Sequence, residues 1–213
     1  MVTVNKYPPK ENAGRPEQQP ESLYESRFEH DACGIGFVAN LNGNKNHQTV
    51  SDALTVLENM EHRGACGAEK NSGDGAGIMI QLPHEFLFET CLQQGVHLPA
   101  FGRYGVGMVF FPKDIRRREE CREIFSRASA KIGLELLCWR KVPVDNKHIG
   151  ATALSVEPEL EQVFLACPDA LSSPDDFERK LFVLRNYASH LINSSVQQDE
   201  GIGVGVLQIV QNL

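Results

Sequence analysis

The chain changes character at residue 32, and this boundary limits which part of it can build a folded core. Residues 1–32 hold four of the eleven prolines and only seven large apolar residues, which follow no helical or strand period. Such a segment buries too little apolar surface to offset the entropy lost on ordering it. We therefore expect residues 1–32 to be a largely disordered leader and residues 33–213 to be the folded part.

The residues after this boundary alternate between short apolar runs and amphipathic helical patterns. The apolar runs predict strands over residues 34–41, 77–82, 106–111, 135–142, 163–166 and 203–210. The i, i+3, i+4, i+7 spacing predicts helices over residues 48–62, 83–94, 114–132 and 173–192. Thr49 or Ser51 is the expected cap of the first helix. Helices and strands are mixed along the chain, and the pattern permits antiparallel as well as parallel pairing.

Composition narrows the possible partners. Lysine and arginine number 21 against 28 aspartates and glutamates, so the formal net charge is −7. An acidic chain lacks the basic footprint of a nucleic-acid-binding protein, and no apolar run is long enough to cross a membrane. We expect neither nucleic acid nor membrane as a partner.

The six cysteines are spread along the chain, and none has C-x-x-C spacing. This spacing is typical of neither a secreted disulfide framework nor a zinc site, so we expect no bound metal. Reduced thiols indicate a cytoplasmic location.

Cys33 stands where the polar leader meets the first predicted strand. If the Ala32–Cys33 bond is cut, Cys33 carries both a thiol nucleophile and a free α-amine. That amine has a pKa near ~8 and can act as the base for the thiol. The alternative is a small, buried core cysteine. The position of Cys33 by itself leaves both interpretations open.

Arg63 lies at the end of the first predicted helix, between His62 and Gly64. A cation in the last turn and a glycine just beyond it are common signals of a helix end. The functional alternative is an arginine that points into a cleft and holds a carboxylate or a neighbouring loop with its planar fork.

The run from Asn71 to Gly77 is a glycine-rich turn that carries Gly73 and Asp74. It lacks the Lys-Ser/Thr of a phosphate-binding loop and the alternating carboxylates of a calcium loop. A tight connection that needs glycine for its backbone conformation is one interpretation, and a loop that borders a functional site is the other.

Three motifs, taken together in this order and spacing, resemble one known family. They are Asp31-Ala32-Cys33-Gly34-Ile35-Gly36-Phe37, Glu61-His62-Arg63-Gly64-Ala65 and Ser72-Gly73-Asp74-Gly75-Ala76-Gly77. The chain is similar, from about Leu23 to about Asn193, to the N-terminal glutaminase domain of the large subunit of glutamate synthase. That domain is a class II glutamine amidotransferase of the N-terminal-nucleophile hydrolase type.

The resemblance implies an α+β fold, namely a four-layer αββα sandwich of two mostly antiparallel sheets, here incomplete at its C-terminal end. It implies that residues 1–32 are a propeptide and that Cys33 becomes the first residue of the mature chain. The Cys33 thiolate would attack the side-chain amide of L-glutamine and release ammonia. Arg63 matches an arginine beside the nucleophile, and Gly73 and Asp74 match a loop near the site.

The resemblance also implies partners and cofactors that this segment does not bind itself. In the full enzyme, ammonia passes to 2-oxoglutarate, and FMN and an iron–sulfur cluster supply the reduction. The remaining synthase domains and a small electron-donating subunit are the implied protein partners.

Three hypotheses follow from these observations. The chain is either the glutamine-hydrolysing part of a glutamate synthase or a truncated, non-catalytic remnant of it. A thiol redox sensor at Cys33 or Cys66 is the third. From Ser194 onward the likeness to the family is lost. The resemblance implies that the family's oxyanion hole lies beyond this chain, as do the arginine and aspartate that bind the substrate's α-carboxylate and α-amine. Each oxyanion donor contributes about 10²–10³ in rate. We therefore expect little turnover from this chain alone, and self-association through an exposed final strand.

Overall fold

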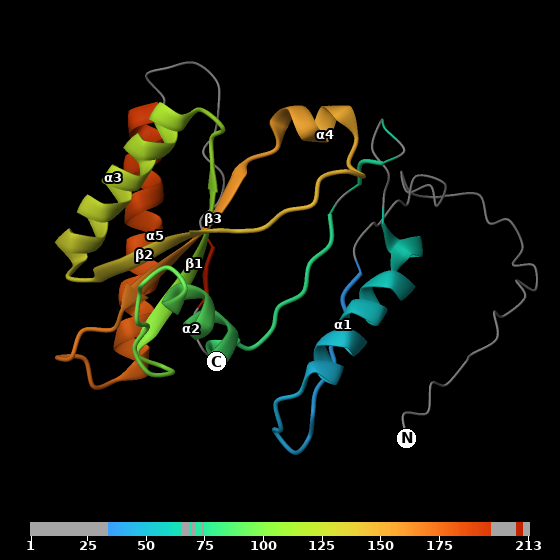
Figure 1. Cartoon of the computed structure of the whole chain (residues 1–213), viewed down its shortest axis with the longest axis horizontal. Coiled ribbons are helices and arrows are strands. Elements are labelled where there is room, and N and C mark those ends of the chain that lie inside the picture. Colours follow the sequence, from blue (N-terminus) through green and yellow to red (C-terminus); the bar gives the residue numbers. More distant parts are fainter. Residues whose placement is uncertain (1–33, 65–68, 70, 74, 197–207, 211–213) are drawn as a thin grey trace, which may run out of the picture.

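The computed structural model describes residues 34–64, 69, 71–73, 75–196 and 208–210. The leader, Cys33 and Asp74 lie outside the described residues. Figure 1 shows a sheet with helices on both sides of it and a separate helix at the far end. In chain order the elements are α1 (His47–Asn59), η2 (Glu61–Arg63), α2 (His84–Leu92), β1 (Tyr104–Phe111), α3 (Ile115–Ile132), β2 (Glu135–Lys141), α4 (Ala151–Val156), β3 (Glu159–Ala166), α5 (Pro174–Val196) and β4 (Gln208–Val210).

The strands form one antiparallel sheet in the order β2-β3-β1-β4. β1 and β3 pair along their whole length, from Tyr104 opposite Ala166 to Phe111 opposite Glu159. The mixture of helices with an antiparallel sheet confirms the expected α+β class. The described residues contain one sheet, so the four-layer sandwich stays a prediction.

One face of the sheet carries the larger core and is covered by α3 and α5 (Figure 1). Alternate residues of β1 and β3 point to this face, since successive strand side chains lie on opposite sides. Each helix presents one stripe to the sheet because its buried residues recur every three or four positions. These residues are Cys121, Ile124, Phe125 and Ala128 on α3, and Phe177, Leu181, Leu184, Ala188 and Ile192 on α5.

The opposite face carries a smaller core, in which α2 packs on Tyr104, Val106 and Phe164. A bulge in β2 shapes this side. Leu136 pairs with Leu165 and Cys138 with Phe164, so Leu137 is the extra residue. As a result Leu137 and Cys138 both contact the smaller core, and Cys138 meets Cys91 of α2.

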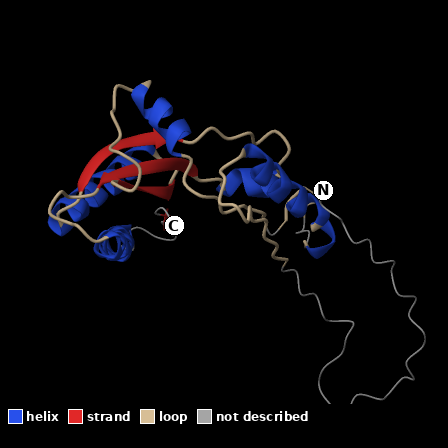
Figure 2. Ribbon diagram, turned by 90° about the horizontal axis from the view of Figure 1, so that it is seen from below, coloured by secondary structure: helices blue, strands red, loops and turns tan. Residues whose placement is uncertain are grey.

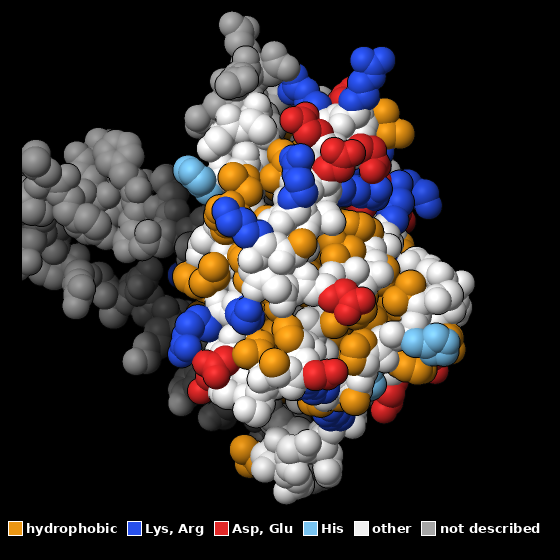
Figure 3. Space-filling model, turned by 90° about the vertical axis from the view of Figure 1, so that its left-hand side faces the viewer, with side chains coloured by type: hydrophobic (Ala, Val, Ile, Leu, Met, Phe, Trp, Pro, Cys, Tyr) orange, Lys and Arg blue, Asp and Glu red, His pale blue; other side chains and the backbone are white. Residues whose placement is uncertain are grey.

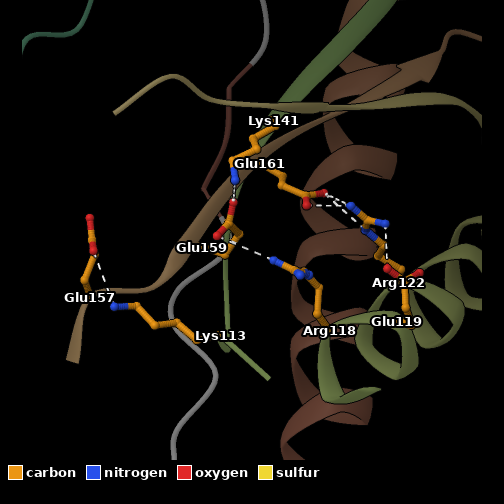
Figure 4. Close-up of polar contacts among 8 residues, drawn as sticks. All are labelled: Lys113, Arg118, Glu119, Arg122, Lys141, Glu157, Glu159 and Glu161. Atoms are coloured by element: carbon orange, nitrogen blue, oxygen red, sulfur yellow. Dashed lines mark hydrogen bonds and ion pairs between the residues drawn. The ribbon is translucent and has the colours of Figure 1, made fainter. Parts of the chain in front are cut away.

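Ion pairs fasten α3 to the sheet (Figure 4). Glu161 of β3 is only 3% exposed, and Arg122 of α3 donates to its carboxylate from both Nε and Nη2. Glu159, two residues earlier on β3, pairs with Arg118 of α3 and with Lys141 of β2. Because a buried carboxylate requires a partner, this network favours the same face of α3 toward the strand as the apolar stripe does.

The surface on the α3 side mixes charges of both signs with hydrophobic side chains (Figure 3). Neighbouring charges pair along the helices, as Arg179 does with Asp176 on α5 at 3.0 Å. No helix among the described residues is long and apolar enough to span a membrane.

The N-terminal part of the described chain departs most from the predicted elements. Residues 34–40 and 75–83 are neither helix nor strand, so the strands predicted at 34–41 and 77–82 are wrong here. The first helix is capped by Asn46, whose side chain accepts from the Thr49 N–H at 2.9 Å, and not by Thr49 or Ser51. Figures 1 and 2 both place α1 away from the sheet, at the end of the molecule opposite α3.

Candidate functional site

The segment that directly follows Cys33 lies against one side of α1 and η2. A Cβ built on Gly34 would lie 3.0 Å from the Met60 sulfur and 3.2 Å from the Arg63 Cβ, and one on Gly36 would lie 2.6 Å from a Val56 methyl. Val56, Met60 and Arg63 are spaced by four and three residues, so they share one face. The two glycines allow the backbone to approach this face closely. The structure therefore brings Arg63 next to the residue that follows Cys33.

Arg63 is positioned by a short 3-10 turn. Its N–H donates to the Met60 carbonyl at 2.8 Å, and the Gly64 N–H donates to the Glu61 carbonyl at 3.1 Å. Gly64 has φ −86° and ψ 146°, which is ordinary extended backbone. The cation followed by glycine therefore ends the 3-10 turn, whose cap is Gly64, and not α1, which has already ended at Asn59. The Arg63 side chain is exposed.

The glycine-rich turn is partly described. Gly73 is exposed, and Gly75 has φ +85°, a left-handed conformation that favours glycine. This confirms the tight-connection interpretation for Gly75 and leaves the functional one open. Asp74 lies outside the described residues, so its place near the site stays a prediction.

Glu69 fixes the start of this turn to the connection between β2 and β3. The Thr152 N–H donates to both Glu69 carboxylate oxygens, at 3.1 and 3.0 Å, and the Ser72 hydroxyl donates to Oε2 at 3.0 Å. These hydrogen bonds hold the pKa of Glu69 below its usual range, the backbone bond from Thr152 contributing most. Sequence reasoning missed Glu69 and Thr152, because a contact across 83 residues leaves no local pattern.

The described cysteines behave as core residues. Burial raises the pKa of Cys121 to about 11 and that of Cys138 to about 12, and it also raises the pKa of Cys91 and Cys167. Within the described ranges no three His, Cys, Asp or Glu side chains gather as a metal site would require. Among the described thiols only Cys91 and Cys138 meet, and a pair of protonated thiols does not fit an iron–sulfur cluster, which is held by several thiolates at one place. Cys33 and Cys66 lie outside the described residues.

Comparison with known proteins places the chain in a family. Residues 33–205 match the family model described as glutamine amidotransferases class-II. The chain belongs to the class-II glutamine amidotransferases. The matched region begins at Cys33 and continues past Asn193, where the motif-based resemblance stopped.

The relatives of this class-II amidotransferase are glutamate synthases. It is 42% identical over 177 residues to the NADH glutamate synthase of Schizosaccharomyces pombe, an alignment that covers 81% of this chain and 8% of that protein. It is 39% identical over 170 residues to the NADPH glutamate synthase large chain of Bacillus subtilis, covering 80% and 11%. The ferredoxin-dependent glutamate synthase of Oryza sativa is 37% identical over 191 residues, covering 90% and 12%. The expected resemblance to the amidotransferase part of glutamate synthase is confirmed, and the chain spans about a tenth of these relatives.

Proposed function

We propose that this chain is the glutamine-hydrolysing part of a glutamate synthase and that Cys33 is its nucleophile. Removal of residues 1–32 frees the α-amine of Cys33, which takes the proton from the thiol. The thiolate then attacks the side-chain amide carbon of L-glutamine, and the proton leaves with ammonia. Water hydrolyses the γ-glutamyl thioester to glutamate. The observation that carries this proposal is the close approach of Gly34 to the Cβ and Cγ of Arg63, which puts the stem of the arginine beside the residue after Cys33.

Arg63 has the chemistry to hold a carboxylate or a neighbouring loop beside the nucleophile, since its planar fork donates two parallel hydrogen bonds. Gly73 and Asp74 border the same site in this proposal. The start of the family match at residue 33 supports Cys33 as the first mature residue.

In the whole protein, ammonia passes to 2-oxoglutarate, and FMN and an iron–sulfur cluster bound outside this chain supply the reduction. The remaining synthase domains, and a small electron-donating subunit, are the proposed partners.

A non-catalytic form of the same domain is the second candidate, and one observation favours it. A nucleophile needs a rigid support, yet residues 34–40 belong to no strand, and the side chains of Ile35 and Phe37 are 98% and 94% exposed. Under this hypothesis the 213-residue chain keeps its leader and Cys33 stays unreactive toward glutamine analogues.

The test combines intact mass measurement with a chloroketone analogue of glutamine. We expect the purified chain to lose residues 1–32 and to gain one adduct on Cys33, with L-glutamine slowing the reaction. Cys33→Ala should gain none, while the matched variant Cys167→Ala should react as the original chain does. Retention of the leader with no adduct on Cys33 would rule out the catalytic proposal and leave the second candidate.

A further inference from the structure

The glycine-rich turn is fastened at a second point, well away from Gly34. Glu69 accepts from the Thr152 N–H and from the Ser72 hydroxyl, while the Ser72 N–H donates to the Glu69 carbonyl at 3.1 Å. One carboxylate thus joins the turn to the residues that begin α4, as the neighbouring positions of α4 and this segment in Figure 1 show. We call this set of contacts the Glu69 clamp.

Gly150 makes room for the clamp. A Cβ at Gly150 would lie 2.1 Å from Glu69 Oε2 and 2.6 Å from the Ser72 hydroxyl oxygen. The backbone of Gly150 has φ −66° and ψ 158°, which any residue adopts, so the requirement for glycine is steric. Any side chain at this position would push the carboxylate away from the Thr152 N–H.

The clamp and the Gly34 contact lie on either side of one short stretch of chain. Arg63 rests on the Gly34 backbone, and six residues later Glu69 is held at Thr152. Hydrogen bonds that hold Glu69 and Ser72 in place before a ligand binds lower the entropy lost on binding at this turn. Ser72, which Glu69 holds through two hydrogen bonds, directly precedes Gly73 in the chain.

We propose that Glu69 is a positioning residue of the amidotransferase site, which holds Ser72 and the adjoining Gly73 against the start of α4 without touching the substrate. This inference rests on the function proposed above. The Glu69 carboxylate acts as a charged acceptor, which gives shorter and stronger hydrogen bonds than a neutral one. Glutamine at position 69 keeps one acceptor oxygen of the same reach and so retains part of the clamp.

The experiment compares Glu69→Ala, Glu69→Gln and Gly150→Ala in the 213-residue chain, with Glu89→Ala as an exposed-carboxylate control on α2. We measure the modification of Cys33 by the glutamine chloroketone, and obtain its maximal rate and the half-saturating chloroketone concentration. We also measure the rate at which iodoacetamide modifies Cys33. We also measure the melting temperature and the hydrogen exchange of the Thr152 amide.

We expect Glu69→Ala and Gly150→Ala to react about tenfold to a hundredfold more slowly with the chloroketone, since small misplacement of binding groups has effects of this size. Their iodoacetamide rates and melting temperatures should stay unchanged, and exchange at Thr152 should be faster. Glu69→Gln should recover most of the rate, and it also serves if Glu69→Ala does not fold. Glu89→Ala should match the original chain in every readout.

The other outcomes separate the two proposals. If Cys33 of the original chain reacts but Glu69→Ala reacts equally fast, the positioning role is wrong. A parallel loss of chloroketone rate, iodoacetamide rate and melting temperature means that Glu69 is merely structural, which also overturns the role. If Cys33 of the original chain never reacts with the chloroketone, the proposed function fails. In that case hydrogen exchange at the Thr152 amide still tests the Glu69 clamp. Unchanged exchange in Glu69→Ala overturns the clamp, and faster exchange supports it.

Discussion

Arg63 lies against the backbone of Gly34, with its Cβ 3.2 Å from the point where a Cβ on Gly34 would stand. The contact joins two of the motifs on which the family resemblance depends, and it puts the guanidinium stem one residue from Cys33. Neither motif by itself specifies this meeting. The contact forms because the segment after Cys33 runs along the side of α1 and η2 that carries Val56, Met60 and Arg63.

Replacing Arg63 should weaken recognition of a glutamine analogue without unfolding the chain. Hydrogen bonds to a charged group contribute about 1.5–3 kcal/mol, which corresponds to about a tenfold to hundredfold change in affinity. We expect Arg63→Ala, and to a smaller extent Arg63→Lys, to raise the half-saturating chloroketone concentration by this factor. Arg116→Ala, an exposed arginine on α3, is the control. Unchanged saturation in Arg63→Ala would remove Arg63 from the site.

The Arg122–Glu161 pair should contribute far more to stability than the Arg122–Glu119 pair. The Glu161 side chain is 4% exposed and that of Glu119 is 54% exposed, although both contact the same guanidinium. Removing Glu161 takes from Arg122, whose side chain is 29% exposed, its charged hydrogen bonds to a buried carboxylate, and such bonds contribute about 1.5–3 kcal/mol. An exposed pair contributes less than about 1 kcal/mol. Urea unfolding of Glu161→Ala and Glu119→Ala measures both, and equal losses would contradict the ranking.

The buried thiols should make the chain less stable at alkaline pH. The pKa of Cys121 is raised to about 11 and that of Cys138 to about 12, in both cases mainly by burial, whereas an unfolded thiol ionises near ~8.5. The unfolded state therefore loses these protons first. The stabilisation is complete below about pH 8.5 and is lost as pH rises toward the folded pKa values.

Urea unfolding between pH 8 and pH 10.5 checks this dependence. We expect Cys121→Ala to lower stability at pH 8 but to show a shallower decline with pH than the original chain. An identical decline in the variant would mean that the Cys121 thiol does not contribute to it. Cys167→Ala, which removes a half-buried thiol whose pKa is raised less, is the comparison.

Two phenylalanines should differ sharply in their effect on folding. Phe125 is 1% exposed in the larger core and Phe37 is 94% exposed after Cys33. Phe125→Ala should cost about 3–5 kcal/mol through lost burial and a cavity. Phe37→Ala should change the free energy of unfolding by less than about 0.5 kcal/mol. A large loss on Phe37→Ala, dependent on protein concentration, would show that this segment is buried between copies in solution.

The periodic elements of the sheet-and-helix body could be predicted from the sequence. The predicted helices over residues 114–132 and 173–192 match α3 and α5 closely, because long amphipathic patterns bury one stripe whatever they pack on. β3 is longer than the predicted strand over residues 163–166 and begins at Glu159. The first half of β3 carries Glu161, whose burial depends on Arg122 of α3. The polar residues there therefore did not predict a strand.

The candidate site divides in a similar way. Sequence motifs pointed to its proposed residues, which are Cys33, Arg63, Gly73 and Asp74. This was possible because a thiol, a guanidinium and a glycine-rich turn can each be recognised from residue type and order. Sequence alone therefore determined the family, the α+β class and the residues to test. Tertiary structure decided that Arg63 meets Gly34 and that Glu69 meets Thr152, because close approach of distant backbones depends on packing and on the glycines that permit it.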